Sequence, residues 1–274
     1  MPTTPLRLVL GSALLLAMLA LSGCDVNINL GEDEVVTSGS VSGKFHAEKV
    51  ENLTRAIQET SVQVETRNGE VDVRQIEGAK EVTITVTIKT GGKTQETADE
   101  RLGKVKTIAE EKDGTLTLRA EFPKPVYNTD AAAFKVEVPK LRDVLARTNN
   151  GAVIVHAASG VVDGTSSNGT IRITDAGSSV RAKSMNGSIS ITMNAAATGP
   201  IEVEAVNGSV EAEVGAGFGG TLEMSTTNGK IDFRDNNERA KKSTIRKHSG
   251  SVVLEGSGES TLKTVNGSVT VVVR

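Results

Sequence analysis

The sequence predicts an all-β protein: a right-handed parallel β-solenoid of about seven or eight rungs, with a small α+β region capping its N-terminal end. Three observations lead to this prediction. An Asn-Gly phrase is repeated down the second half of the chain, successive copies are 17 to 21 residues apart, and the parity of the apolar positions changes at each copy. A period near 20 residues accommodates two short strands and two turns, which is one rung of a solenoid. Crossovers between parallel strands are nearly always right-handed.

The repeated pair is expected to form the corner between the two strands of each rung. Small or apolar residues precede each Asn at even offsets, and apolar residues follow it at odd offsets, as Val203 and Val210 do around Asn207. Since strand side chains alternate with a period of two, this change means that one extra residue is absorbed at the corner. Asn and Gly tolerate positive φ, which suits a tight corner. The predicted corners are Asn68-Gly69, Asn150-Gly151, Asn168-Gly169, Asn186-Gly187, Asn207-Gly208, Asn228-Gly229, Ser249-Gly250 and Asn266-Gly267.

A row of antiparallel hairpins is the alternative interpretation of the same pair. Asn-Gly between alternating strands is the strongest short hairpin signal. The connections between copies vary in length and composition, whereas the Asn-Gly pair recurs. Variable loops on one edge and a constant corner on the other favour stacked rungs.

The first 23 residues are typical of a lipoprotein signal peptide. Arg7 precedes an apolar run from Leu8 to Leu21, and Leu21-Ser22-Gly23-Cys24 follows, which resembles the lipobox of bacterial lipoproteins. The resemblance implies cleavage before Cys24 and lipidation of that residue, the only cysteine, so no intrachain disulfide is possible. We expect a membrane-anchored protein that faces the periplasm or the exterior. Asp25 resembles an inner-membrane retention signal, but the choice between inner and outer membrane stays open.

Three segments follow the signal peptide. Residues 24–44 form a polar, flexible tether, residues 45–147 a β-rich region with one short helix, and residues 148–274 the Asn-Gly solenoid. Within 45–147, Val62, Val64, Val71 and Val73 repeat the phrase around Asn68. Strands are expected over 82–88, 116–120 and 134–138, with a turn at 113–114, and a helix over 94–104 capped by the first residue of that range.

The order of these motifs resembles a known family. A Thr-Arg-Asn-Gly-Glu-Val-Asp-Val unit is followed by a Thr-Gln-Glu-Thr-Ala-Asp helix, a Lys-Asp-Gly-Thr-Leu-Thr-Leu turn, a Phe-Lys-Val-Glu-Val-Pro strand and serial Thr-x-Asn-Gly phrases. From residue 45 to 274 the chain is similar to the bacterial putative-adhesin family of uncharacterised β-solenoid domains. The resemblance implies an extracytoplasmic, largely parallel β-helical protein and assigns no catalytic or binding residues.

The residue pattern favours no catalytic or metal chemistry. His46, His156 and His248 lie in unrelated contexts without zinc-ligand spacing. The segment 235–238, Asp-Asn-Asn-Glu, is the best acidic cluster, yet it lacks the spacing of known calcium loops. Neither a Gly-x-Ser-x-Gly elbow nor a phosphate-binding glycine loop before a helix occurs. We therefore expect no cofactor and no metal, and a net charge of -3 argues against a nucleic-acid partner.

These observations favour a non-enzymatic, lipid-anchored envelope protein that serves as an adhesin-like binding or structural module. Exposed strand positions are candidate contacts for a protein or glycan partner: Arg172, Ser190, Glu211, Asp232 and Thr270. One alternative is a self-assembling scaffold, because the apolar strand Val269–Val273 ends the chain without an obvious cap. The other is a β-helical enzyme acting on polysaccharide, which the short loops and the 2% aromatic content disfavour.

Overall fold

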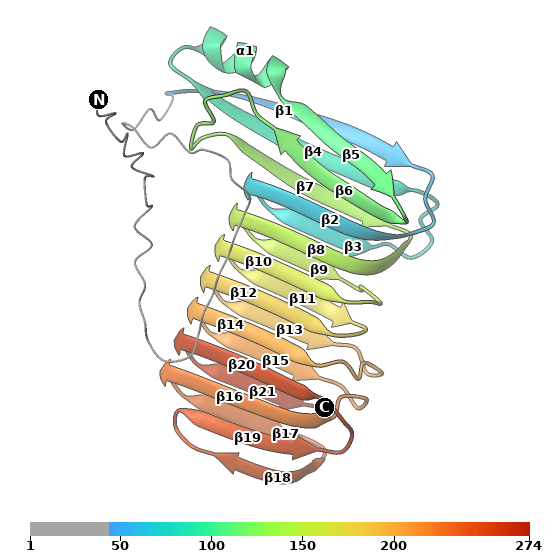
Figure 1. Ribbon diagram of the computed structural model, residues 1–274, viewed down its shortest axis with the longest axis vertical. Coiled ribbons are helices and arrows are strands. Elements are labelled where there is room, and N and C mark those ends of the chain that lie inside the picture. Colours follow the sequence, from blue (N-terminus) through green and yellow to red (C-terminus); the bar gives the residue numbers. More distant parts are fainter. Residues whose placement is uncertain (1–43) are drawn as a thin grey trace, which may run out of the picture.

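The computed structural model describes residues 44–274, which form two parallel-rich β-sheets and one helix (Figure 1). The expected signal peptide, Cys24 and nearly all of the expected tether lie outside the described residues. Sheet A consists, in spatial order, of β1 (Phe45–Arg55), β4 (Val82–Gly92), β7 (Ala131–Val138), β3 (Val71–Gln75), β9 (Val153–His156), β11 (Ile171–Ala176), β13 (Ile189–Met193), β15 (Val210–Val214), β21 (Val269–Val273) and β17 (Ile231–Asp235). Sheet B consists of β18 (Ala240–Ile245), β19 (Ser249–Leu254), β16 (Gly220–Asn228), β20 (Glu259–Asn266), β14 (Ile201–Asn207), β12 (Val180–Asn186), β10 (Val162–Asn168), β8 (Lys140–Asn150), β2 (Glu59–Asn68), β6 (Thr115–Glu121) and β5 (Lys106–Lys112).

The Asn-Gly pairs join strands of opposite sheets and not the two strands of a hairpin. Each Asn is the last residue of a strand in sheet B, and the next strand along the chain lies in sheet A. Strands with equivalent positions in the repeat pair in parallel and in register, so that Asn168 lies between Asn150 and Asn186. The hairpin alternative is therefore wrong for these pairs, and the solenoid-like stacking of strand pairs is confirmed.

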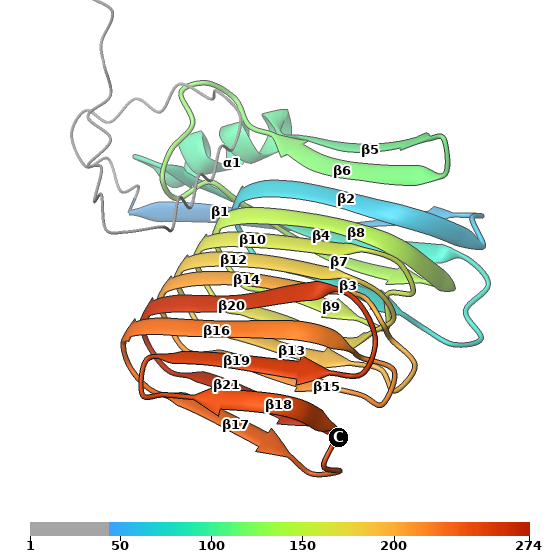
Figure 2. The same cartoon turned by 60° about the horizontal axis from the view of Figure 1, so that its bottom comes forward.

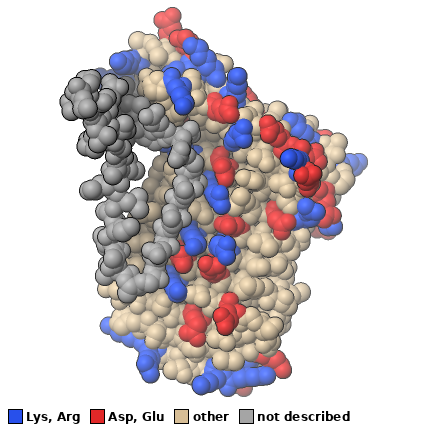
Figure 3. Space-filling view, in the orientation of Figure 1, with Lys and Arg blue, Asp and Glu red and all other residues tan. Residues whose placement is uncertain are grey.

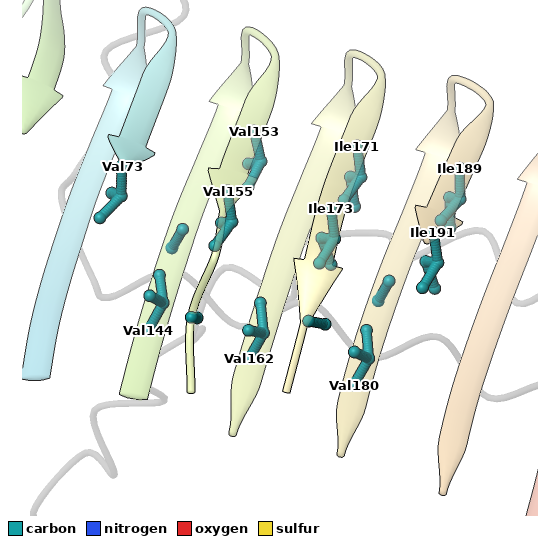
Figure 4. Packing of buried hydrophobic residues seen from close by; sticks show 14 of the residues in the cluster. Val73, Val144, Val153, Val155, Val162, Ile171, Ile173, Val180, Ile189 and Ile191 are labelled. Carbon is teal, nitrogen blue, oxygen red and sulfur yellow. The ribbon is translucent and has the colours of Figure 1, made fainter. Parts of the chain in front are cut away.

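The change in parity at each corner directs apolar side chains from both sheets into one core. Around Asn168, the buried positions include Val162, Gly164 and Ser166 before the corner and Ile171 and Ile173 after it. The equivalent valines and isoleucines of successive strand pairs lie above one another in columns (Figure 4). Thin layers of β-branched residues fill the space between the sheets, which is why the chain needs so few aromatic residues.

The corner glycines are required by close packing between neighbouring strand pairs. A Cβ atom added to Gly187 would overlap with the carbonyl oxygen of Gly169, and one added to Gly169 would overlap with that of Gly151. Only Gly69 among the predicted corner residues has a positive φ, 139°, and no corner Asn does. The expectation that positive φ explains the pair was wrong, because the backbone approaches its neighbour too closely for any side chain.

The N-terminal end is covered by a β-rich cap that carries the helix. β1, β4 and β7 extend sheet A in antiparallel order, and the hairpin β5–β6 extends sheet B (Figure 2). Helix α1 (Gln95–Lys104) begins after Thr94, whose hydroxyl accepts a hydrogen bond of 3.1 Å from the Thr97 amide. The hairpin turns at Asp113 and Gly114, both with positive φ. The expected division at 147/148 falls inside β8, so the two sheets run through it without interruption.

The C-terminal strands lie inside the stack and not at its end. β20 pairs with β14 on one side and β16 on the other, and β21 likewise lies between β15 and β17. Val269–Val273 is therefore paired on both edges, contrary to the expectation of an uncapped apolar end. The end of the stack opposite the N-terminal cap is instead formed by β17 in sheet A and by the antiparallel hairpin β18–β19 in sheet B.

Ser249-Gly250 is not a corner of the repeated type. Ser249 begins β19, which runs antiparallel to β16 within the same sheet and pairs Gly250 with Met224. A Cβ atom on Gly250 would lie 3.0 Å from the side chains of Ile245 and Met224, so the glycine here makes room for core side chains. Ser249 follows Asn228 by 21 residues and so fits the period of the sequence repeat. In the structure, however, Ser249 and Gly250 begin a strand of the same sheet instead of joining the two sheets.

Candidate functional site: the corner edge and the outer faces

The corner edge is lined by a continuous ladder of asparagine side chains, which we call the Asn ladder. Its seven members, in spatial order, are Asn228, Asn266, Asn207, Asn186, Asn168, Asn150 and Asn68. Each Nδ2 donates to the Oδ1 of the next member at 2.6 to 2.8 Å. All seven amides point the same way along the stack, so the Asn228 end presents an acceptor and the Asn68 end a donor.

A second ladder of hydroxyl groups lies beneath the first. The residue two positions before the corner is a Ser or Thr in six of the seven copies, and its hydroxyl donates to a backbone carbonyl of the neighbouring strand pair. Ser184, for example, donates to the Gly169 carbonyl at 3.2 Å, and Thr264 to the Gly208 carbonyl at 2.7 Å. Ala205 interrupts the row, so the Gly187 carbonyl receives no such hydroxyl within residues 44–274.

The Asn ladder is anchored at the N-terminal cap by a buried ion pair. Asn68 Nδ2 donates to the Asp130 carbonyl at 2.7 Å. The Asp130 carboxylate is fully buried and lies 2.5 Å from Arg101, and it also accepts from the Tyr127 amide at 2.8 Å. The Arg101 guanidinium lies 4.0 Å from the centroid of the Tyr127 ring. Helix α1, the loop between β6 and β7, and the ladder are thus held at one point.

The exposed positions expected to contact a partner form one row across sheet A. Arg172 pairs in register with Ser190, Ser190 with Glu211, Glu211 with Thr270, and Thr270 with Asp232. The structure therefore brings all five together, although they are spread over the sequence from position 172 to position 270. The row mixes charged and hydroxyl side chains.

The outer face of sheet B carries charges that are paired between neighbouring strands. Arg181 lies 2.8 Å from Glu202, and Lys183 lies 2.9 Å from Glu204. The hydrogen bond that the Arg181 guanidinium donates to the Glu202 carboxylate raises the pKa of Arg181 above its usual value. Such exposed pairs contribute little to stability, but they neutralise the face on which they lie.

The remaining candidates do not converge on a site. His46, His156 and His248 are exposed on β1, β9 and the β18–β19 turn, far apart in the topology. The Asp235 carboxylate accepts from the backbone amides of Ala240 at 2.7 Å and Asn237 at 3.3 Å. Desolvation acts to raise the pKa of Asp235, but backbone hydrogen bonds outweigh it and lower that pKa. This carboxylate is occupied in ordering its own loop.

Metal sites and membrane-spanning helices are not found in the part of the chain that the structure describes. Residues 44–274 place no three His, Cys, Asp or Glu side chains where they could share an ion. The one helix in this range is too short and too polar to cross a membrane.

Two shallow hollows indent the outer face of sheet B. One, of about 300 Å³, lies over β2, β8 and the start of β10, and its Asp143 carboxylate accepts from the Ser61 hydroxyl and the Val161 amide. The other, of about 360 Å³, lies over β16, β19 and β18 at the C-terminal end, and includes Lys242 and Arg246. Both hollows are open grooves and not enclosed cavities, so they suit surface contacts better than a sequestered reaction.

The family model of the Toastrack domain DUF4097 matches residues 57–273. The chain belongs to the Toastrack family. This match covers the stacked strands and most of the cap, and it confirms the resemblance to an uncharacterised adhesin-like family. A comparison with curated proteins finds no match.

Several solved structures resemble the Toastrack chain at low identity. A putative cell adhesion protein from Clostridium sporogenes shares 11% identity with a TM-score of 0.40, over 82% of this chain and 100% of that one. A putative adhesin from Bacteroides fragilis shares 14% identity with a TM-score of 0.34, over 82% and 97%. A putative lipid binding protein from Parabacteroides distasonis shares 12% identity with a TM-score of 0.30, over 82% and 96%.

Three structural features were not predicted from the sequence. The Ser/Thr residues two positions before each corner are visible in the repeat, and their regularity could have indicated the hydroxyl ladder. The pair Arg101–Asp130 carries no sequence signal, because its partners meet only through the cap. The run of basic residues from 239 to 248 is visible in the sequence, but its position at one end of the molecule is not.

Proposed function

We propose that this chain is a non-enzymatic, lipid-anchored protein of the bacterial cell envelope, which serves as an adhesin-like binding or structural module. The module is a right-handed parallel β-solenoid of about seven or eight rungs. The observation that carries the proposal is the Asn ladder with its underlying hydroxyls. These polar side chains are engaged with one another and with the backbone, as expected of a rigid scaffold whose exposed strand positions contact a partner.

The anchor is proposed from Cys24 alone, through the Leu-Ser-Gly-Cys motif. Two or more acyl chains would hold the protein on a membrane effectively permanently, since each buried methylene contributes about 0.8 kcal/mol. Fractionation of cells that produce the full chain or its Cys24→Ser variant tests this. We expect the parent in the membrane fraction and the variant outside it. An unchanged distribution would show that the anchor is wrong.

The binding role is tested by cross-linking intact envelopes and recovering the full chain, with the Cys24→Ser protein as the control for placement. We expect a reproducible protein or glycan partner that depends on placement at the membrane. Recovery of the chain without any partner would count against a binding module and leave only the structural one.

Self-assembly remains the second candidate, because β17 ends sheet A with one unpaired edge in the described structure. Light scattering over a range of protein concentrations separates the two candidates. A mass that stays that of a monomer excludes assembly, whereas growing species would favour a scaffold built from copies of this chain.

A further inference from the structure

The C-terminal end of the stack carries a groove of about 360 Å³ on the outer face of sheet B, which we call the end groove. It is lined by Glu223, Lys242, Thr244, Arg246, Ser249, Gly250, Ser251 and Val253. These residues come from β16, β18, β19 and the turn between β18 and β19, and Lys and Arg side chains gather at this end of the molecule (Figures 1 and 3). The end groove thus has a floor of three strands and a basic outer rim.

The rim cations follow the line of β18: Lys242 lies within the strand, and Arg246 follows directly after its last residue, Ile245. Lys242, Thr244 and Arg246 alternate on the same face, since side chains two apart in a strand point the same way. Two cations four residues apart are separated by about 13 Å along the strand. Thr244 pairs in register with Ser251 between them, so hydroxyl groups fill the interval. A row of cations with hydroxyls between them can contact several anionic groups at once.

Neither rim cation is engaged within the described residues. Lys242 and Arg246 form no ion pair within 4.0 Å in residues 44–274, unlike Arg181 and Lys183 on the same face. The one carboxylate of the end groove, Glu223, accepts a hydrogen bond of 2.7 Å from Ser251. Both cations therefore remain available to an external anion.

The basic residues next to the rim cations in the sequence, Arg239 and Lys241, have partners within the described residues. Arg239 donates to the carbonyls of Gly215, Ala216 and Phe218 and so holds a loop in place. Lys241 lies 3.4 Å from Glu255 on the surface. Within residues 44–274, the rim cations therefore face the groove without an ion-pair partner, whereas Arg239 and Lys241 have partners.

Protection of an edge strand does not by itself account for this charge. Lysines on an edge strand discourage pairing with other chains, and β5, the opposite edge of sheet B, has Lys106 and Lys112. On β5 they are balanced by Glu110 and Glu111, so the strand has no net charge. The segment 239–248 has five Lys or Arg residues and no acid. The excess of one sign is specific to the end that contains the groove.

The chemistry of the end groove fits an extended polymer better than a flat membrane or stacked bases. No aromatic residue lines it, so it lacks the platform on which nucleic-acid bases stack. Ile245, the one large apolar side chain of β18 that is exposed, has the opposite parity and reaches toward Gly250 and the core. Val253 is the one aliphatic side chain that lines the groove, and it is half-buried, so the groove offers a membrane surface no protruding apolar anchor.

We propose that the end groove binds a linear polyanion of the cell envelope, with Lys242 and Arg246 contacting separate anionic groups of the same polymer. The inference rests on the proposed binding role and names the class of its partner. Linear polyphosphate is the probe, measured by calorimetry on the full chain. Because a bound polyanion releases about 0.7 counterion per charge contacted, K242Q/R246Q should reduce the salt slope by about 1.4 and the affinity about 25-fold at about 0.1 M salt.

Three comparisons decide the outcome. The matched variant K106Q/K112Q removes two lysines from the opposite edge strand and should bind as the parent does, and the charge-conserving K242R/R246K should retain binding. Thermal melts establish that each variant is folded. Equal losses of polyphosphate affinity in K242Q/R246Q and K106Q/K112Q would overturn the proposal. So would a K242Q/R246Q variant that keeps the affinity of the parent and forms new dimers, because the cations would then serve to protect the edge strand.

Two further measurements distinguish a polyanion in the end groove from a membrane surface and from another envelope partner. Binding to vesicles of phosphatidylglycerol but not to polyphosphate would overturn the proposal in favour of a membrane surface. Absence of polyphosphate binding, together with recovery of an envelope partner by cross-linking, would overturn this inference and leave the proposed function standing.

Discussion

Replacement of Asn186 by Ala should destabilise the protein about twice as much as replacement of Asn228. Asn186 lies in the middle of the Asn ladder, where its amide donates to Asn168 and accepts from Asn207, both at 2.8 Å. Asn228 lies at the end and makes one ladder bond, to Asn266, also at 2.8 Å. The comparison therefore removes two ladder hydrogen bonds in one variant and one in the other.

The expected magnitudes follow from the exposure of the ladder. A hydrogen bond contributes about 0.5–1.5 kcal/mol net, and the lower half of that range applies because these amides reach water, which can replace a lost partner. We expect N186A to lower the free energy of unfolding by about 1–2 kcal/mol and N228A by about half as much. For a domain of this size, 1 kcal/mol corresponds to about 2–4 °C in Tm.

Urea unfolding followed by circular dichroism measures both variants, with Asn149→Ala as the matched control. Asn149 is a half-exposed neighbour of the ladder residue Asn150, and no side-chain hydrogen bond of Asn149 occurs within the described range. N149A should change the free energy by less than about 0.5 kcal/mol. Equal effects of N186A and N228A, or an effect of N149A as large as theirs, would refute the ladder as a source of stability.

Three other predictions concern the contacts around the ladder. Ala205→Ser should stabilise the protein by about 1 kcal/mol in the same unfolding assay, because its hydroxyl can reach the Gly187 carbonyl; a loss of stability would contradict the hydroxyl ladder. Asp130→Ala should cost about 3–5 kcal/mol and loosen helix α1 in hydrogen exchange, since it leaves Arg101 buried without its partner. The depressed pKa of Asp235 contributes stability that is fully present above its ordinary value of 3.8 and is lost as pH falls through the lower folded pKa. Asp235→Asn should therefore unfold with less dependence on pH below 4 than the parent, and identical acid transitions would contradict that role.

Local elements were predictable where the sequence pattern and the packing agree. The helix begins after Thr94 and ends at Lys104 as expected, because capping and propensity act over neighbouring residues. The strands around the Asn-Gly pairs were predictable because the buried positions alternate with the strand period and change parity at each corner. The row from Arg172 to Asp232 also follows from the repeat, since equivalent positions stack.

The reason for the glycine at each corner was not predictable in the same way. A sequence pattern shows that Gly is present, but whether it serves a positive φ or a close approach depends on the neighbouring backbone. Gly187 is needed because Gly169 of the adjacent strand pair leaves no space for a Cβ atom. That neighbour is a tertiary contact, 18 residues away in the sequence.

By itself the sequence determined which residues turn, which face the core, and that strand pairs of one kind stack on each other. Only the tertiary structure decided the order of the stack. β20 and β21 lie between strand pairs that precede them in the chain, and β18–β19 forms a hairpin where the spacing suggested another corner at Ser249. The physical reason is that the repeats are nearly interchangeable: each presents the same Asn, the same glycine and the same layer of small apolar side chains to its neighbours. Local preferences therefore cannot distinguish one stacking order from another, and the choice is made by contacts between distant segments, above all by the antiparallel pairing of β19 with β16.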